Sequence, residues 1–367
     1  MAVHLKPKNA QELLTIDGVQ LFVGQAGIKK PDYNDVTLMV LSPNSRVAGV
    51  FTQNRYCAAP VRVCQELLPS NNIRALVVNT GNANAGTGED GLKRARAVCA
   101  AVAEQIKCEA NQVLPFSTGV ILEPLPYEKI QTAIKKMKPV HWDVAAKAIM
   151  TTDTVAKSGS RELVVDGEHV RFTGISKGSG MIHPNMATML GFIAVDANIA
   201  TEVLQVLVKE VADKTFNCIS VDGDTSTNDT ILGLANGASG VTAASAADMG
   251  LLEEALTAIL AQVSYMLVKD GQEFFVEEDW GQVLEDIEYD IPFIKYPYVS
   301  FYTSRGCPAQ CTFCLWPQTM SGHRIRTRSI GNVVAELKRA FRHFPEAREI
   351  FFDDDTFTWN RQRIMEF

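Results

Sequence analysis

The chain has 367 residues, of which 46% are apolar, and its 35 basic and 42 acidic side chains give it a formal charge of −7. The apolar fraction is too high for a disordered chain, and the mild acidity argues against a nucleic-acid binder that works through bulk positive charge. The N-terminal stretch has no apolar core of signal-peptide length, and no apolar run reaches the roughly 20 residues that span a bilayer. We therefore expect a cytoplasmic protein of two or three domains, without a membrane or nucleic-acid partner.

Aromatic residues are distributed unevenly along the chain. Residues 272–367 hold 18 of the 29 aromatic side chains but only 4 of the 25 glycines. Two segments of one domain rarely differ so much, so the composition indicates two pieces that join near residue 271. No linker rich in Gly, Ser or Pro marks this joint, as it would at an ordinary domain boundary.

The first piece alternates predicted strands and helices. Strand patterns cover residues 73–79, 113–117 and 190–195, together with a hairpin at residues 162–172 that turns at Asp166-Gly167. Helical patterns cover residues 89–107, 127–137, 143–150, 201–213 and 249–268. This order predicts an α/β fold in which helices cover a sheet.

The second piece, residues 272–367, has its own order of predicted strands and helices. Residues 298–303 predict a strand, a cysteine-containing loop follows, and residues 330–344 and 349–352 predict a helix and another strand. Strand, loop, helix and strand form one βαβ unit of a parallel sheet or barrel. The second piece is therefore expected to be a partial βαβ barrel fragment.

Five segments of the first piece are rich in Thr, Gly and Asn. Each alone is typical of a turn or a helix cap, but small residues also let the backbone approach a ligand, and hydroxyls serve as nucleophiles and donors. The segments are residues 79–88, 117–119, 150–154, 177–190 and 222–230. Residue types alone do not single out one nucleophile among so many threonines.

Residues 177–190 (KGSGMIHPNMATML) and Thr118-Gly119, with MTTDT at residues 150–154 between them, resemble the ornithine acetyltransferase family of arginine biosynthesis. This family is also called bifunctional glutamate N-acetyltransferase, and the resemblance runs from about residue 19 to residue 271. It implies an α+β layered sandwich, here incomplete, and self-cleavage between Ala187 and Thr188. The expected domains of this part are an α-chain of residues 1–187 and a truncated β-chain of residues 188–271. After cleavage the protein would assemble as an α/β heterotetramer.

The resemblance also implies the chemistry. The Thr188 hydroxyl would attack the carbonyl of Ala187, the acyl group would shift from N to O, and water would release a chain that begins at Thr188. The freed α-amino group would then act as the base for its own hydroxyl. This hydroxyl would take the acetyl group from N-acetylornithine and pass it to glutamate in ping-pong order, without a cofactor. Whether acetyl-coenzyme A also serves as donor stays open.

The family's supporting residues map onto this chain. Thr118 and Gly119 would supply the oxyanion hole. Lys177 and Thr151, or its neighbour Thr152, would hold polar groups of the substrate together with Thr188. The alternative for Thr188 is a buried threonine at the start of a strand.

The chain departs from the family after residue 271. The family continues there with Glu-Gly-Ala-Thr-Lys, whose Glu helps to bind the substrate, whereas this chain has Gln272 followed by Glu-Phe-Phe. We expect the family's remaining C-terminal part to be missing, with its Asn and hydroxyl residue of the substrate site. Self-cleavage is then expected to persist, while transfer becomes inefficient.

Two further groups have an ordinary structural interpretation. Asp222, Asp224 and Asp229 suggest a metal site, but they lack the spacing and the Glu of a calcium loop and favour a turn rich in Thr and Asp. His183, beside Pro184, is a candidate base. A structural role is favoured for it, because the α-amino group is the base in the family.

Cys307, Cys311 and Cys314 cluster with C-x3-C-x2-C spacing. Three thiolates can bind three irons of a [4Fe-4S] cluster and leave the fourth iron open, whereas a zinc site usually needs four ligands in paired short spacings. Residues 295–329, with Phe313 before the third cysteine, resemble radical S-adenosylmethionine enzymes of the cobalamin-associated branch seen in hopanoid biosynthesis. This resemblance implies a cluster and S-adenosylmethionine in residues 272–367.

The whole chain is therefore interpreted as a fusion of two incomplete proteins. The main hypothesis is an acetyltransferase that acts through Thr188. The alternatives are a radical S-adenosylmethionine iron–sulfur fragment, supported by the three clustered cysteines, and an inactive chimera.

Overall fold

The computed structural model describes residues 6–70, 72–165, 167–182, 189–219, 221, 225–242, 246–271, 298–305, 325–352 and 360–367. The chain divides into two compact units between residues 271 and 272. The division falls where the aromatic content of the sequence changes. Short 3-10 helices in the larger unit are Ala10–Glu12, Leu68–Ser70, Ala110–Gln112 and Phe216–Cys218.

The first sheet of the larger unit has five strands in the order β5-β4-β2-β1-β6. The strands are β1 (Val19–Gly24), β2 (Val36–Leu41), β4 (Ala75–Asn82), β5 (Val113–Val120) and β6 (Lys138–Val140). Strands β4 and β5 pair in parallel, and the other neighbours are antiparallel. Because parallel neighbours need a crossover connection, β4 is followed by helix α2 (Gly88–Ile106) before β5 begins.

The second sheet also has five strands, in the order β3-β10-β9-β8-β7. They are β3 (Arg46–Phe51), β7 (Lys157–Val165), β8 (Glu168–Lys177), β9 (Leu190–Val195) and β10 (Thr230–Ala235). Strands β7 and β8 form the predicted hairpin and extend beyond its predicted ends. Strands β9 and β10 are parallel, with helix α5 (Thr201–Lys214) between them in the chain.

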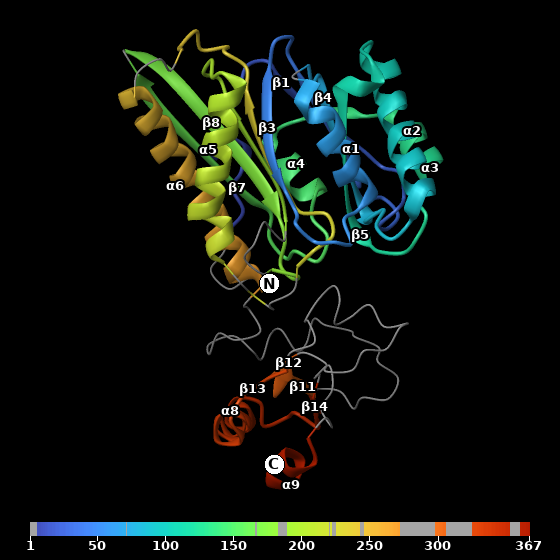
Figure 1. Cartoon of the computed structure of the whole chain (residues 1–367), viewed down its shortest axis with the longest axis vertical. Coiled ribbons are helices and arrows are strands. Elements are labelled where there is room, and N and C mark those ends of the chain that lie inside the picture. The colour runs from blue at the N-terminus through green and yellow to red at the C-terminus, as the bar shows by residue number, and fades with distance from the viewer. Residues whose placement is uncertain are drawn as a thin grey trace. The chain divides into compact units, whose positions relative to one another are not determined.

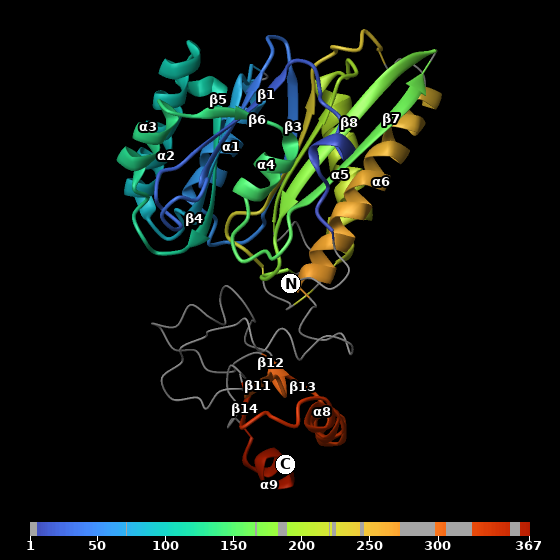
Figure 2. The same ribbon diagram turned by 180° about the vertical axis from the view of Figure 1, so that it is seen from behind.

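The two sheets pack face to face, with helices on both outer faces (Figures 1 and 2). Buried side chains of both sheets share one core, in which the rings of Phe116 and Phe192 meet edge to face at 5.2 Å. Helices α2 and α3 (Tyr127–Ile134) cover the first sheet, and α5 and α6 (Ala246–Gly271) cover the second. The layered sandwich is thus confirmed, but it contains two mixed sheets where the strand and helix patterns predicted one.

Two more helices complete the larger unit. Helix α1 (Ala59–Leu67) begins with Pro60 in its first turn, where a missing N–H costs no hydrogen bond. Helix α4 (Trp142–Ala148) contacts strands of both sheets, and its Trp142 is buried. These contacts connect the two layers at one end of the sandwich.

Helix α6 is long and apolar. Its stretch Asp248–Asp270 has a mean hydropathy of 1.4 and, within the described ranges, is the one helix long and apolar enough to cross a membrane. Half of this stretch is buried, and Leu252, Ile259 and Leu267 belong to the core outside the second sheet. Core packing therefore accounts for its apolar composition.

The smaller unit contains a parallel pair of strands. Strands β11 (Tyr298–Phe301) and β14 (Glu349–Phe352) pair in parallel, and α8 (Ile330–His343) lies between them in the chain. The side chain of Ser329 caps α8 by accepting a hydrogen bond from the N–H of Asn332. The remaining elements are β12 (Ser304–Arg305), β13 (Arg326–Thr327) and α9 (Arg361–Glu366). The predicted strand–helix–strand order is present, but two parallel strands do not make a barrel.

Candidate active site

Strands β4 and β5 end side by side at two glycines. The ladder pairs Thr80 with Thr118 and Gly81 with Gly119, and its register then shifts at Asn82. Gly119 has a φ of 135°, and a Cβ atom there would overlap the carbonyl carbon of Gly81. Only glycine accepts both this φ and this close approach of two backbones. The predicted oxyanion residues therefore lie at a point where the main chain is tightly constrained.

Two hydrogen bonds of the Asn79 side chain fix the ends of β4 and β5. Its side-chain oxygen accepts a hydrogen bond of 2.6 Å from the Ser117 hydroxyl, and its amide donates to the carbonyl of Asn82 at 2.8 Å. All three side chains are buried. Because water does not reach these side chains, it does not compete for the hydrogen bonds that fix the Thr118-Gly119 segment.

Gly119→Ala is expected to reduce acetyl transfer by about 10²- to 10³-fold, the usual effect of losing one oxyanion donor. The reason is that the new methyl group would push β5 away from Gly81. Gly167→Ala is the matched control, because Gly167 also has a positive φ of 86° but has open space around it. Steady-state rates check the prediction, and equal rates for both variants would contradict it.

Asp153 organises the turn that carries Thr151 and Thr152. One carboxylate oxygen accepts the N–H of Thr151 at 3.0 Å. The other oxygen accepts the N–H of Gly178 at 2.5 Å and the ammonium group of Lys157 at 2.6 Å. The Thr152 hydroxyl lies 2.9 Å from the hydroxyl of Ser179. These contacts bring the predicted substrate-binding threonines next to the end of β8, where Lys177 lies.

A buried ion-pair network continues from Asp153. The ammonium group of Lys157 also binds Asp270, and none of these three side chains has exposed surface. Asp270, in the last turn of α6, accepts hydrogen bonds from the N–H and, at 2.5 Å, the hydroxyl of Thr154. The C-terminal end of α6 is thereby fastened to the site.

The charged groups around Asp153 favour the ionised form of its carboxyl group. Burial by itself would raise the pKa of Asp153. The ammonium groups of Lys157 and Lys177, with the hydrogen bonds from Lys157 and Gly178, outweigh burial and hold this pKa below its usual value. Asp153 is therefore ionised near neutral pH.

Lys177 lies at the C-terminal end of β8 and is partly exposed. Burial lowers its pKa from the ordinary lysine value, while the carboxylates of Asp153 and Asp229 oppose this shift and Lys157 adds to it. The carboxylates of Asp153 and Asp229 therefore favour the charged form of Lys177, and burial disfavours it.

Lys29 connects the two parts of the site. Its ammonium group donates to the carbonyl of Met150 at 3.0 Å and lies 4.4 Å from the centre of the Tyr33 ring. Its backbone nitrogen is close to Gly81, where an added Cβ atom would lie 2.8 Å away. Burial lowers the pKa of Lys29, and Lys177 acts in the same direction. The oxyanion segment and the Lys177 segment are thus linked through the loop that carries Lys29.

Five described residues are ones that the sequence singled out as catalytic or substrate-binding: Thr118, Gly119, Thr151, Thr152 and Lys177. The structure places the turn with Thr151 and Thr152 beside the end of β8, which carries Lys177. It links this turn to the strand end at Gly119 through the loop that carries Lys29. The other candidates lie outside the described residues; they are His183, Ala187, Thr188, Asp222, Asp224, Cys307, Cys311 and Cys314. Met189, which follows Thr188, is described and buried. No group of three metal-ligating side chains occurs in the part of the chain that the structure describes.

Sequence reasoning missed several charged residues of this site. Lys29, Lys157 and Asp270 carry no local motif that distinguishes them from surface charges. Asp153 lies within the MTTDT segment at residues 150–154, but only the threonines of that segment were singled out. Asp229 was assigned to a turn rich in Thr and Asp. It follows a bend at residues 227–228, directly precedes β10 and is 2% exposed.

Comparison with known proteins identifies the family. Residues 20–274 match the ArgJ family. The arginine biosynthesis bifunctional protein ArgJ of Neisseria meningitidis is 54% identical over 277 residues, which are 74% of this chain and 68% of that protein. The ArgJ protein of Neisseria gonorrhoeae shows the same identity and the same coverage.

Two solved structures are also similar. Arginine biosynthesis bifunctional protein argJ from Bacillus halodurans is 38% identical with a TM-score of 0.44, covering 47% of this chain and 92% of that one. Ornithine acetyltransferase from Mycobacterium tuberculosis, solved with ornithine, is 32% identical with a TM-score of 0.42, covering 49% and 98%. From the family match and the 54% identity to its members, the chain belongs to the ArgJ family.

Proposed function

We propose that this chain transfers an acetyl group from N-acetylornithine to glutamate in arginine biosynthesis. The observation that carries the proposal is the 54% identity, over 277 residues, to arginine biosynthesis bifunctional proteins. A structural relative is named ornithine acetyltransferase and was solved with ornithine. The site geometry supports acyl transfer, because the backbone at Gly119 is tightly constrained and the loop that carries Lys29 links it to the turn with Thr151 and Thr152.

In the proposed mechanism Thr188 is the nucleophile. Its hydroxyl first attacks the carbonyl of Ala187, and the N-to-O acyl shift breaks the amide bond and frees the α-amino group of Thr188. Water then hydrolyses the resulting ester, which releases the carboxylate of Ala187 and restores the Thr188 hydroxyl. This amine takes the hydroxyl proton while the oxygen attacks the acetyl carbonyl of N-acetylornithine. Ornithine leaves as an amine with that proton, and acetyl-Thr188 remains. The amino group of glutamate then attacks this ester and regenerates the free hydroxyl.

The described residues take supporting roles in this proposal. Main-chain N–H groups at Thr118 and Gly119 stabilise the oxyanion of each tetrahedral intermediate. Lys177 and the turn with Thr151 and Thr152 bind polar groups of the amino-acid substrate. A charged lysine suits the α-carboxylate that both N-acetylornithine and glutamate carry.

The assembly and the cellular setting belong to the same proposal. The cleaved enzyme works as an α/β heterotetramer in the cytoplasm, on small-molecule substrates, and needs no cofactor for acetyl transfer. Acetyl-coenzyme A is a further candidate donor, because the curated relatives are named bifunctional.

The proposal is tested by trapping the acetyl-enzyme. Incubation with N-acetylornithine alone should release ornithine equivalent to the enzyme and leave one acetyl group on the peptide that begins at Thr188, measured by mass spectrometry. Added glutamate should remove this group as N-acetylglutamate. Full transfer activity without acetylation of that peptide would contradict the mechanism.

A second candidate function concerns residues 272–367. We propose that Cys307, Cys311 and Cys314 bind a [4Fe-4S] cluster that holds S-adenosylmethionine. The supporting observation is the parallel pairing of β11 and β14, because in chain order these cysteines fall between β11 and α8 and so follow the first strand of a βαβ unit. Three thiolates fit a cluster with one open iron.

Anaerobic reconstitution of the full chain with iron and sulfide tests this second candidate. Bound iron should disappear when the three cysteines are replaced by Ser. It should persist in Cys218→Ser, since Cys218 is an exposed free thiol of the larger unit. Iron binding that is equal in both variants, or absent from the parent chain, would contradict the cluster.

A further inference from the structure

Two segments that the sequence assigned to substrate binding leave the same end of the β7–β8 hairpin. The turn with Thr151 and Thr152 precedes β7, and Lys177 ends β8. The ladder between these two strands begins at the pair Lys157–Ser176, so no ladder hydrogen bond holds the turn to the end of β8. The distance between the two segments therefore depends on side chains.

Asp153 binds both segments with the two oxygens of one carboxylate. Its Oδ2 atom accepts the N–H of Thr151 at 3.0 Å, and its Oδ1 atom accepts the N–H of Gly178, which follows β8, at 2.5 Å. Gly178 has a φ of 147°, which L side chains rarely adopt, so the course of the main chain past Asp153 requires glycine there. The hydroxyls of Thr152 and Ser179 form a second link at 2.9 Å, but this link is exposed and water competes with it.

Lys157 fixes the carboxylate of Asp153 in place. Its ammonium group donates to Oδ1 of Asp153 at 2.6 Å and to the carbonyl of Val155 at 3.1 Å, and it also pairs with Asp270. The side chains of Asp153, Lys157 and Asp270 have no exposed surface. An ionised carboxylate has acceptors on both oxygens, so it can hold two separate N–H groups at once, whereas an amide has one acceptor oxygen.

We propose that Asp153 is a positioning residue, whose buried carboxylate holds the Thr151–Thr152 turn at a fixed distance from the Lys177 segment, so that both reach one substrate molecule. That these segments bind the substrate rests on the proposed function, whereas the hydrogen bonds of Asp153 do not. Asp153 itself touches no substrate in this proposal, because main-chain N–H groups and Lys157 occupy its oxygens. It acts through the geometry of the two segments.

Asp153→Asn separates the two hydrogen bonds of the carboxylate. The amide oxygen should take the position of Oδ1, because an NH2 group there would face the ammonium group of Lys157. The NH2 group then faces the N–H of Thr151, and two donors meet without an acceptor. Hydrogen exchange of the full chain, resolved to single amides by fragmentation mass spectrometry, should show the N–H of Thr151 exchanging at least about tenfold faster, while that of Gly178 stays protected.

Two results of the exchange experiment would overturn the proposal. One is an unchanged exchange rate at Thr151 in the folded Asn variant. The other is an equal acceleration at amides throughout the larger unit, because this would show a general loss of stability. Asp153→Ala removes both acceptors, so in this second variant the N–H groups of Thr151 and Gly178 should both exchange faster.

The Asn variant is expected to fold. Lys157 keeps Asp270 as its partner, so no buried cation is left without a carboxylate. The amide also has nearly the same size and shape as the carboxyl group that it replaces. Thermal unfolding of the variant checks this expectation before the exchange rates are compared.

Asp196→Asn is the matched control. Asp196 is also buried, at 5% exposure, and its Oδ1 atom accepts the main-chain N–H of Arg171 at 2.8 Å. It follows β9 at the end opposite to the one that pairs with Lys177. This variant should leave the exchange rate of Thr151 unchanged, and an acceleration as large as that in Asp153→Asn would overturn the proposal.

Kinetics test the consequence for the substrate. In Asp153→Asn the KM for N-acetylornithine should rise by about tenfold with a smaller change in kcat, because the substrate loses contact with one of the two segments. Partial unfolding would instead lower kcat per mole of chain and leave KM unchanged, and that result would overturn the positioning role. If the parent chain transfers no acetyl group, the proposed function fails, and the exchange rates still decide whether Asp153 holds the two segments together.

Discussion

Thr188→Ala should leave the chain as one band on a denaturing gel, where the parent chain gives two fragments that divide between residues 187 and 188. Without the hydroxyl there is no N-to-O acyl shift, so the α-amino group that serves as base is never released. Acetyl transfer should fall by at least roughly 10³-fold, because nucleophile and base are lost together. Gel electrophoresis and a transfer assay measure both effects.

Thr188→Ser provides the control, since it keeps the hydroxyl and should still cleave. Two outcomes would contradict the role of Thr188. One is cleavage of the Ala variant at the same bond. The other is a parent chain that remains in one piece and transfers acetyl groups at full rate.

Lys157→Met should lower the free energy of unfolding of the larger unit by about 3 to 5 kcal/mol, the usual cost of removing one partner from a buried ion pair. The substitution leaves Asp153 and Asp270 buried without their shared cation. It also removes one of the links between the end of α6 and the turn that carries Thr151, while the hydrogen bonds from Thr154 to Asp270 remain. Denaturant unfolding at neutral pH measures the loss.

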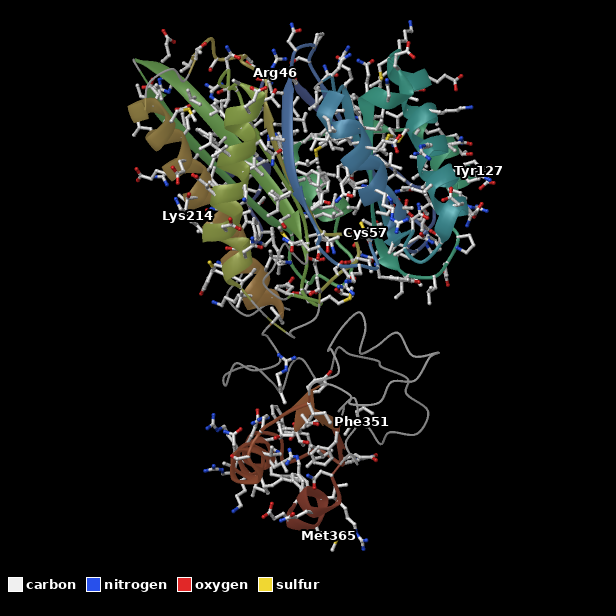
Figure 3. All side chains as sticks on the ribbon, viewed as in Figure 1. Arg46, Cys57, Tyr127, Lys214, Phe351 and Met365 are labelled. Atoms are coloured by element: carbon white, nitrogen blue, oxygen red, sulfur yellow. The ribbon has the colours of Figure 1, made fainter. Side chains whose placement is uncertain are left out.

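Lys214→Met is the matched control for this prediction. Lys214, labelled in Figure 3, ends α5 and pairs with Glu253 at the protein surface. Exposed pairs are screened by solvent and contribute little, so this variant should unfold almost as the parent does. Similar losses in the two variants would show that the Asp153–Lys157–Asp270 network is not a special source of stability.

The Asp153–Lys157–Asp270 network makes the free energy of unfolding depend on pH in the acid range. The pKa of Asp153 is lowered in the native state, so the stability it contributes is present above its unfolded pKa and is lost as the pH falls through its native pKa. Lys157→Met removes the main cation behind this shift. The variant should therefore lose less stability between neutral and acid pH than the parent, in unfolding experiments at a series of pH values.

Local patterns predicted much of the secondary structure. Helix α5 and the β7–β8 hairpin depend on apolar spacing and turn residues within short windows, and both occur at nearly the expected residues. Strands β1, β2, β3 and β10 were not predicted. Strand β2 is buried almost throughout, so it lacks the alternation that identifies a half-exposed strand. Helix α6 was predicted at residues 249–268, within its observed bounds.

The amino-acid sequence by itself determined the family resemblance, the oxyanion and lysine candidates and the change of composition near residue 271, because each is written in consecutive residues. Only the tertiary structure decided that two sheets share one core and that β3 pairs with β10, from the other half of the larger unit. It also decided which charges meet. Lys157 binds Asp270 across 113 positions. Burial and long-range pairing set these interactions, and neither is encoded in any short segment of the chain.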